Sequence, residues 1–221
     1  LLRIAEIAER FGGEIRLTRE QNFIITHVPS DAVAVTVAEL ARIGLPLGLN
    51  GMRATSVACT GSPLCNFAVS LTKPRLVEIM DRLEASFGKQ VEDLRINLDG
   101  CPHACAQHWI GDIGLQGTTL RERTPEGEKQ EAYDLYLRGG QGVNAAIGVP
   151  LVRRVPAPEV GAHVERLVRV WLDERSESES FKSFADRQPD ERLVAVAADV
   201  SIDEARSRLR RRDSRAEVVD V

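Results

Sequence analysis

The most constraining feature of this sequence is the spacing of its four cysteines. They form a C-x5-C pair and a C-x3-C pair separated by 35 residues: Cys59 and Cys65, then Cys101 and Cys105. Glycine and proline neighbour both pairs, so the backbone can turn around a bulky object and direct the thiols toward it. Four thiolates on two loops are typical ligands of an iron-sulfur cluster. The spacing therefore predicts a cluster held by these four residues.

Three other interpretations of the cysteines stay open on spacing alone. Structural zinc usually binds C-x2-C or C-x4-C knuckles, which neither pair matches. A disulfide framework is typical of short secreted chains, whereas this chain has 221 residues. Unligated cysteines are common in cores, but chance would scatter four of them rather than pair them beside glycine and proline. The pattern favours the cluster over all three.

Composition narrows the class of protein. The chain is 43% apolar, 28% charged and only 5% aromatic, which is typical of a soluble globular protein. No apolar run approaches the ~20 residues of a membrane-spanning helix. A net charge of -4 disfavours a nucleic-acid partner. Because a cluster needs reduced thiols, we expect a cytoplasmic location.

The first 48 residues read as a small α-β-β-α unit. Apolar spacing predicts a helix over 1–11, closed by a glycine pair, and strands over 14–17 and 22–28. A second helix is expected to begin with Ser30 or Asp31 as its N-cap and to end at Arg42, before Gly44. A glycine- and proline-rich linker over 45–52 follows.

A second region, 49–175, carries both cysteine pairs. Strands are expected over 53–58, 94–98, 112–117 and 131–138, and helices over 73–87 and 158–175. Between them we expect a polar hairpin over 118–129 and a glycine-rich loop over 139–148. The first two strands end at the two cysteine loops, which is a rigid way to present ligands. Residues 176–221 are expected to form a polar, partly flexible extension, and its arginine-rich run over 206–215 is assigned no function.

Several segments together resemble one known family. They are Val57-Ala58-Cys59-Thr60-Gly61 through Cys65, Thr72-Lys73, Gly100-Cys101-Pro102-His103-Ala104-Cys105, Asp112-Ile113-Gly114-Leu115-Gln116-Gly117 and, upstream, the T-x-x-Q-N pattern of Thr18, Gln21 and Asn22. Over about residues 1–187 the chain is similar to the sirohaem and iron-sulfur region of assimilatory nitrite and sulfite reductases. The resemblance implies an α+β fold, with a ferredoxin-like α-β-β-α repeat packed on a mixed α/β sirohaem and [4Fe-4S] domain.

The resemblance also implies cofactors and a reaction. The four cysteines would bind a [4Fe-4S] cluster, and the sulfur of Cys105 would also bridge to the iron of sirohaem. The implied reaction is the six-electron reduction of nitrite to ammonia or of sulfite to sulfide. The residues Ala58-Cys59-Thr60-Gly61 favour the nitrite branch of the family, in which ferredoxin is the usual electron donor.

Anionic substrate and the carboxylates of sirohaem both call for basic side chains. The candidates close to a family motif are Arg16, Arg19, Arg53 and Lys73. Arg53 and Lys73 are favoured because they flank the first cysteine loop, although surface charge is an equally good interpretation of any one of them.

Four histidines complete the candidates. His103 stands where the family often has asparagine, and it could hydrogen-bond a cluster sulfur or a sirohaem carboxylate, or equally face solvent. His108 could deliver protons, but a structural role is the better prediction. His27 and His163 read as structural.

The match covers only the later of the family's two pseudo-symmetric halves. We therefore expect a C-terminal portion that does not turn over by itself, with the substrate-gripping residues in the earlier half and no catalytic residue assigned here. Alternatives are a stand-alone [4Fe-4S] electron-transfer subunit, a precorrin-modifying enzyme of the same superfamily, and a zinc-stabilised binding module.

Overall fold

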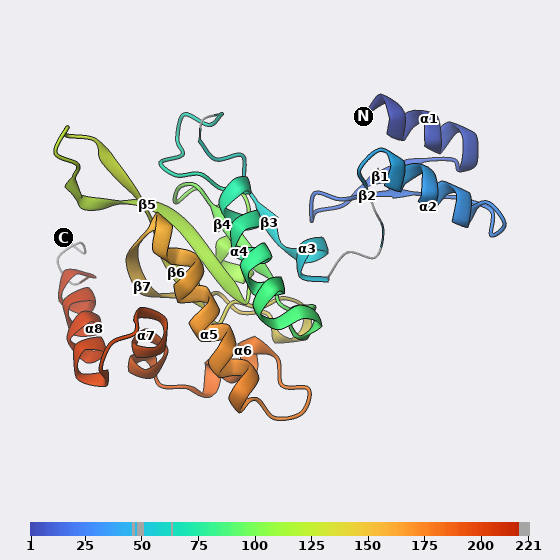
Figure 1. The fold of residues 1–221 in the computed structure, drawn as a ribbon. Coiled ribbons are helices and arrows are strands. Elements are labelled where there is room, and N and C mark those ends of the chain that lie inside the picture. The colour runs from blue at the N-terminus through green and yellow to red at the C-terminus, as the bar shows by residue number, and fades with distance from the viewer. Residues whose placement is uncertain (46, 48–50, 63, 217–221) are drawn as a thin grey trace. The chain divides into compact units, whose positions relative to one another are not determined.

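The computed structural model describes residues 1–45, 47, 51–62 and 64–216. The chain divides between Thr55 and Ser56 into two units, Leu1–Thr55 and Ser56–Val221 (Figure 1). The sequence placed this boundary slightly earlier, between residues 48 and 49. Residues 46 and 48–50 of the expected linker lie outside the described residues, as do residues 217–221 of the expected extension.

The first unit has the expected α-β-β-α order, followed by one short helix. Its elements are α1 (Leu2–Phe11), β1 (Ile15–Leu17), β2 (Phe23–Ile25), α2 (Val33–Arg42) and α3 (Gly51–Thr55). The two strands pair antiparallel, with Arg16 opposite Ile24. The predicted N-cap of α2 is wrong. Ala32 holds that position without a side-chain hydrogen bond, because a turn closed from the Ala32 N–H to the Pro29 carbonyl precedes the helix.

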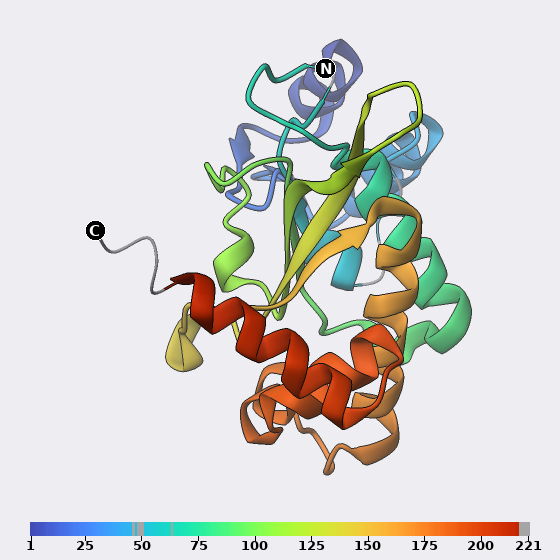
Figure 2. The same ribbon diagram turned by 90° about the vertical axis from the view of Figure 1, so that its left-hand side faces the viewer.

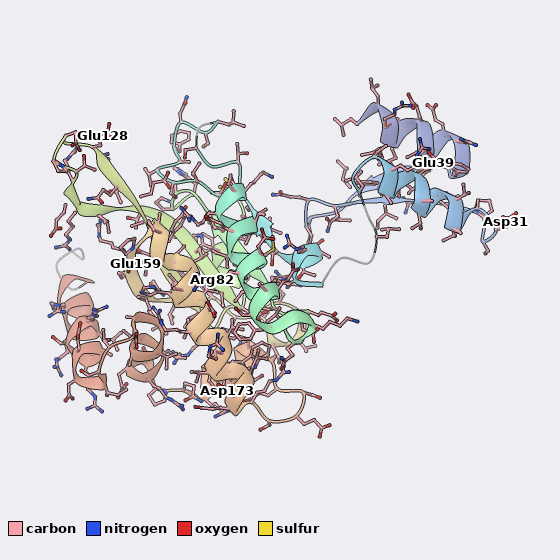
Figure 3. The ribbon with its side chains drawn as sticks, in the orientation of Figure 1. Asp31, Glu39, Arg82, Glu128, Glu159 and Asp173 are labelled. Carbon is pink, nitrogen blue, oxygen red and sulfur yellow. The ribbon has the colours of Figure 1, made fainter. Side chains whose placement is uncertain are left out.

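The second unit is built on a five-stranded sheet in the order β3-β4-β5-β6-β7. The strands are β3 (Val57–Ala58), β4 (Ile96–Asp99), β5 (Ile113–Arg123), β6 (Lys129–Leu137) and β7 (Val149–Pro156). The β3–β4 and β4–β5 pairs are parallel, and the later pairs are antiparallel. A hairpin forms within the segment 118–129, as expected, but β5 extends beyond the predicted end at residue 117 to Arg123, and the turn that contains Glu128 is correspondingly short (Figure 3).

Two expectations for this sheet need correction. The strand expected over 53–58 is only Val57–Ala58, because Gly51–Thr55 is helical and the Thr55 hydroxyl donates to the Gly51 carbonyl one turn earlier. Strand β7 was not anticipated. Its sequence carries Pro150, Arg153, Arg154 and Pro156, which obscure the strand pattern, whereas its place at the sheet edge tolerates proline.

The two faces of the sheet differ in chemistry. Helices α4 (Lys73–Phe87) and α5 (Val160–Glu174) lie side by side across one face (Figure 1). That face is apolar, and its fully buried side chains are Ile96, Leu98, Ile113, Leu115, Leu135 and Leu137. Arg82 of α4 binds Glu165 of α5 (Figure 3). The opposite face carries Asn97, Asp99, Gln116 and Tyr136, because side chains alternate along each strand.

The C-terminal region is helical, in contrast to the expected polar, partly flexible extension. Helices α6 (Phe181–Arg187), α7 (Asp190–Ala198) and α8 (Ile202–Ala216) follow α5 (Figure 2). Phe181, Phe184 and Leu193 are buried, so this region adds to the core. The described part of the unit also contains four 3-10 helices: Gly88–Val91, His108–Ile110, Gly142–Asn144 and Ala157–Glu159. Among the described residues, no helix combines the length and the apolar character needed to span a membrane.

The buried face of α4 can be tested with one core substitution. Leu83 is fully buried on this helix, whereas Val77 of the same helix is 44% exposed. Leu83→Ala should lower the free energy of unfolding by about 2–5 kcal/mol, because it removes buried apolar volume and leaves a cavity. Val77→Ala is the matched control and should cost about 0.5 kcal/mol or less. Denaturant unfolding of the two variants measures the difference, and equal losses would contradict this packing.

A pH-dependent prediction concerns Asp112, just before β5. Burial raises the pKa of this carboxyl to about 6, although the Arg95 N–H donates to it. The folded state therefore holds this proton more tightly than the unfolded state, and stability falls as the pH rises from about 4 to about 6. Asp112→Asn should remove this fall and add about 1–2 kcal/mol at pH 7. Exposed Asp173 is the control site (Figure 3). The free energy of unfolding is measured at pH 4 and pH 7. An equal change between the two pH values in the wild type and in Asp112→Asn would refute the prediction.

Candidate metal centre

The two cysteine loops meet because β3 and β4 are parallel neighbours. Cys59 directly follows β3, and its N–H donates to the Leu98 carbonyl of β4 at 3.0 Å. The Gly100 N–H, one residue beyond β4, donates to the Cys59 Sγ at 3.2 Å. Parallel strands end at the same edge of a sheet, so both loops begin at one edge. The expectation that two strand ends present the two loops agrees with this geometry.

The first loop is tied back to the sheet at both ends. The Thr72 hydroxyl donates to the Cys59 carbonyl at 2.7 Å, and Thr72 is fully buried. Next to it, the Leu71 carbonyl accepts from the Tyr133 hydroxyl of β6 at 2.5 Å. Pro63 lies outside the described residues. The loop is therefore closed by side chains from the residues that precede α4 and from β6.

The four thiols differ in exposure. Cys101 is buried, Cys59 and Cys65 are half-buried, and Cys105 is exposed. Among the described residues, which include all four cysteines, no group of three or more His, Cys, Asp or Glu side chains converges on a single-ion site.

Neighbouring polar and charged groups affect two of the thiols, Cys101 and Cys59. The His103 Nδ1 lies 3.4 Å from the Cys101 Sγ, and the His103 ring packs on Phe67 at a centroid distance of 5.0 Å. Burial raises the pKa of the Cys59 thiol, the N–H groups of Gly100 and Gly61 oppose this, and the charge of Asp99 adds to it. Bound iron stabilises such a thiol as the thiolate, and hydrogen bonds to the sulfur tune the reduction potential of a cluster.

The predicted basic residues fall into different units. Lys73 is exposed in the first turn of α4, in the same unit as the cysteines. Arg16 and Arg53 belong to the first unit. Arg16 is exposed and binds Glu14 at 3.0 Å, whereas Arg53 is half-buried and lines a mostly apolar cavity of about 680 Å³ within that unit. Arg19, also in the first unit, binds Glu20 at 2.7 Å. The structure therefore brings His103 to the cysteines and leaves these arginines in the other unit.

Sequence reasoning missed the polar residues that precede the second loop. Asn97 and Asp99 are 2% and 1% exposed, in a strand whose residues are all buried. Asp99 binds His108, which is fully buried, in agreement with the structural role expected for that histidine. Polar residues at alternating positions of a buried strand indicate specific hydrogen-bond contacts, because buried polar groups need partners. In this sequence the pattern of Asn97 and Asp99 stands just before Cys101.

Comparison with known domains agrees with this architecture. Residues 1–43 match the nitrite/sulfite reductase ferredoxin-like half domain, and residues 50–216 match the nitrite and sulphite reductase 4Fe-4S domain. A ferredoxin-like half domain followed by a 4Fe-4S domain is the class of protein that the fold and the four thiols define. The chain belongs to the nitrite/sulfite reductase family, whose members bind sirohaem and a [4Fe-4S] cluster.

Individual relatives support the same assignment. A sulfite reductase [ferredoxin] of Mycolicibacterium paratuberculosis is 31% identical over 196 residues, which cover 86% of this chain and 35% of the relative. A ferredoxin–nitrite reductase of Synechococcus elongatus is 40% identical over 151 residues, which cover 67% of this chain and 28% of that enzyme. The Mycobacterium tuberculosis NirA structure superposes with a TM-score of 0.77 at 28% identity, over 86% of this chain and 36% of that protein. The chain thus spans about a third of the length of these proteins.

The closure of the first loop predicts a glycine effect. Gly61 has φ +65°, and a Cβ there would collide with the Thr72 hydroxyl oxygen, whereas Gly127 has φ +85° with open space around it. Both Gly→Ala changes incur the left-handed backbone cost of about 1–2 kcal/mol. Gly61→Ala adds the collision and should destabilise by about 2–4 kcal/mol in total. Denaturant unfolding compares the two, and equal losses would mean that Thr72 does not close the loop.

Proposed function

We propose that this chain provides the cluster- and sirohaem-binding part of a reductase that carries out the six-electron reduction of nitrite to ammonia or of sulfite to sulfide. The observation that carries the proposal is the meeting of two turn-rich loops with four free thiols at one edge of a parallel strand pair, within the 4Fe-4S domain of this family. The donor set fits a [4Fe-4S] cluster, because it supplies four thiols in two loops that are hydrogen-bonded together.

Cys59, Cys65, Cys101 and Cys105 are the proposed cluster ligands. Cys105 is the exposed member of the set, which suits a thiolate shared with the iron of sirohaem. With both groups bound, Cys105 would hold cluster and sirohaem together, and the two would supply single-electron transfer to the anion. The protein contributes geometry, since its loops fix where each sulfur lies before any cofactor binds.

The proposed polar contacts differ in their support. The 3.4 Å distance from His103 Nδ1 to the Cys101 Sγ favours a hydrogen bond to a cluster sulfur over one to a sirohaem carboxylate. Lys73 is exposed in the first turn of α4 and is proposed to attract anionic groups. Arg16 and Arg53 are proposed as further cofactor contacts on sequence grounds. Their guanidinium groups carry positive charge and donate hydrogen bonds, which suits carboxylates and small anions.

Nitrite is the favoured substrate and ferredoxin the favoured donor. The 40% identity to a ferredoxin–nitrite reductase supports this choice, although similar relatives include ferredoxin- and NADPH-dependent sulfite reductases. Steady-state assays of the full-length protein that contains this sequence decide the matter. Reduced ferredoxin should support faster consumption of nitrite than of sulfite, and the reverse preference would assign the sulfite branch.

The cofactor assignment is tested on the same protein, purified without oxygen. We expect sirohaem absorption bands and about four to five irons with about four sulfides per chain. Cys105→Ser should abolish the sirohaem bands and turnover, whereas Asn66→Ala, at an exposed position beside Cys65, should retain both. A cluster without tetrapyrrole would favour an electron-transfer subunit. Zinc without acid-labile sulfide would overturn the proposal.

A further inference from the structure

A buried carboxylate lies directly beneath the second cysteine loop. Asp99 ends β4, and its Oδ1 accepts from the Ala106 N–H at 2.6 Å. Its Oδ2 accepts from the His108 N–H at 3.0 Å and lies 2.9 Å from the His108 Nδ1. Both side chains are within 1% of complete burial. The carboxylate therefore holds the segment on the C-terminal side of Cys105 through two hydrogen bonds to backbone N–H groups and one to the His108 ring.

A second side chain on the same face of β4 completes the attachment. The Asn97 Nδ2 donates to the Ala106 carbonyl at 2.9 Å and to the Gln107 carbonyl at 3.1 Å. Residues two apart on a strand point to the same face, so Asn97 and Asp99 act together. Between them they bind N–H and carbonyl groups of the segment 106–108.

The attached backbone is conformationally costly. Ala104 has φ +53° and Gln107 has φ +55°, so left-handed residues lie on both sides of Cys105. Each is costly for a residue with a Cβ, because the Cβ crowds the following carbonyl oxygen. Such a conformation persists only where its surroundings hold it, and hydrogen bonds to a charged group are stronger than those between neutral groups. The bonds to Asp99 and Asn97 offset the cost of the Cys105 loop.

His108 is itself held in one orientation. Its ring packs against Tyr136 and Trp109 at centroid distances of 4.6 and 5.0 Å. The Nε2 atom is buried and has no hydrogen-bond partner among the described residues. A proton on Nδ1 satisfies the bond to Asp99 and leaves only a lone pair at Nε2, so the geometry favours that tautomer.

The same carboxylate is an electrostatic neighbour of the thiols. Asp99 is one of the charges that raise the pKa of Cys59, and it lies two residues before Cys101. A negative charge close to a cluster disfavours the addition of an electron, and burial limits the screening of that charge by water.

We propose that Asp99 and His108 are positioning residues, which hold the Cys101–Cys105 loop in its ligand-binding shape and place a buried negative charge beside the cluster. The proposal has two parts. The loop arm, that these residues hold the shape of the Cys101–Cys105 loop, depends only on the hydrogen bonds of this chain. The charge arm, that Asp99 places a negative charge beside the cluster, rests on the proposed function, and two experiments on the full-length protein separate the two.

The first experiment uses the cluster-free protein and measures the rate of iodoacetamide modification at Cys101 by peptide mass spectrometry. Cys101 is 6% exposed, so its modification requires the loop to open. Asp99→Asn should speed modification about tenfold, the effect of one lost bond to a charged group. His108→Leu should do the same, and His108→Asn, which restores an N–H donor near the Nδ1 position, should return the slow rate.

The control is Asp134→Asn on strand β6, which β5 separates from β4. Asp134 is 5% exposed and accepts from the Arg154 N–H at 2.7 Å, so it is a buried carboxylate with a similar bond on a different strand from Asp99. This variant should leave the Cys101 rate unchanged. Equal rates in the wild type, Asp99→Asn and His108→Leu would overturn the loop arm, as would a rate increase common to Asp99→Asn and Asp134→Asn.

The second experiment measures the reduction potential and the electron paramagnetic resonance spectrum of the cluster. Asp99→Asn should shift the potential to a more positive value, and Asp134→Asn should shift it less. A potential unchanged in Asp99→Asn overturns the charge arm. A wild-type protein that binds no cluster instead refutes the proposed function, while the modification rates at Cys101 still decide the loop arm.

Discussion

Parallel pairing of two short strands, β3 and β4, is the interaction on which the candidate site depends. It places Cys59 beside Gly100 and so joins loops that are far apart in sequence. Parallel neighbours need a crossover connection, and α4 supplies it here. The crossover is stable only because Leu83 and Ile79 of α4 are buried in the core. The position of the thiols is therefore set in part by apolar packing on the face of the sheet that α4 covers.

The two faces of the five-stranded sheet have different roles. Its apolar face meets α4 and α5, while the polar face carries Asn97, Asp99 and Tyr136 toward the segment that follows Cys105. Buried polar groups are costly unless they are bonded, and most of these have partners. This arrangement gives the second loop a fixed shape without relying on the cofactor. The fully buried strand β4 therefore carries the side chains that hold the segment beside the proposed cluster ligands.

Charge balance around the thiols follows from the same geometry. Burial and the nearby charge of Asp99 raise the pKa of the Cys59 thiol, and the N–H groups of Gly100 and Gly61 oppose this. The exposed Lys73 is a further positive group in this unit. Arg16 and Arg53 belong to the other unit, and their proposed contacts with the cofactor or substrate depend on sequence resemblance. The family assignment, by contrast, rests on a domain match that covers most of the chain.

The sequence by itself determined the family, the four thiols and the main elements, because cysteine spacing, glycine positions and apolar periodicity are local signals. Helix α4 and the α-β-β-α order of the first unit agree with those signals. Predictions from local sequence were wrong where contacts with residues distant in the chain determine the structure. Residues 53–55 became helical, β7 formed as an edge strand, and the region after residue 180 folded into helices with buried aromatic rings. Only the tertiary structure revealed that Asp99 binds the backbone beyond Cys105, because that bond requires the chain to fold back over β4.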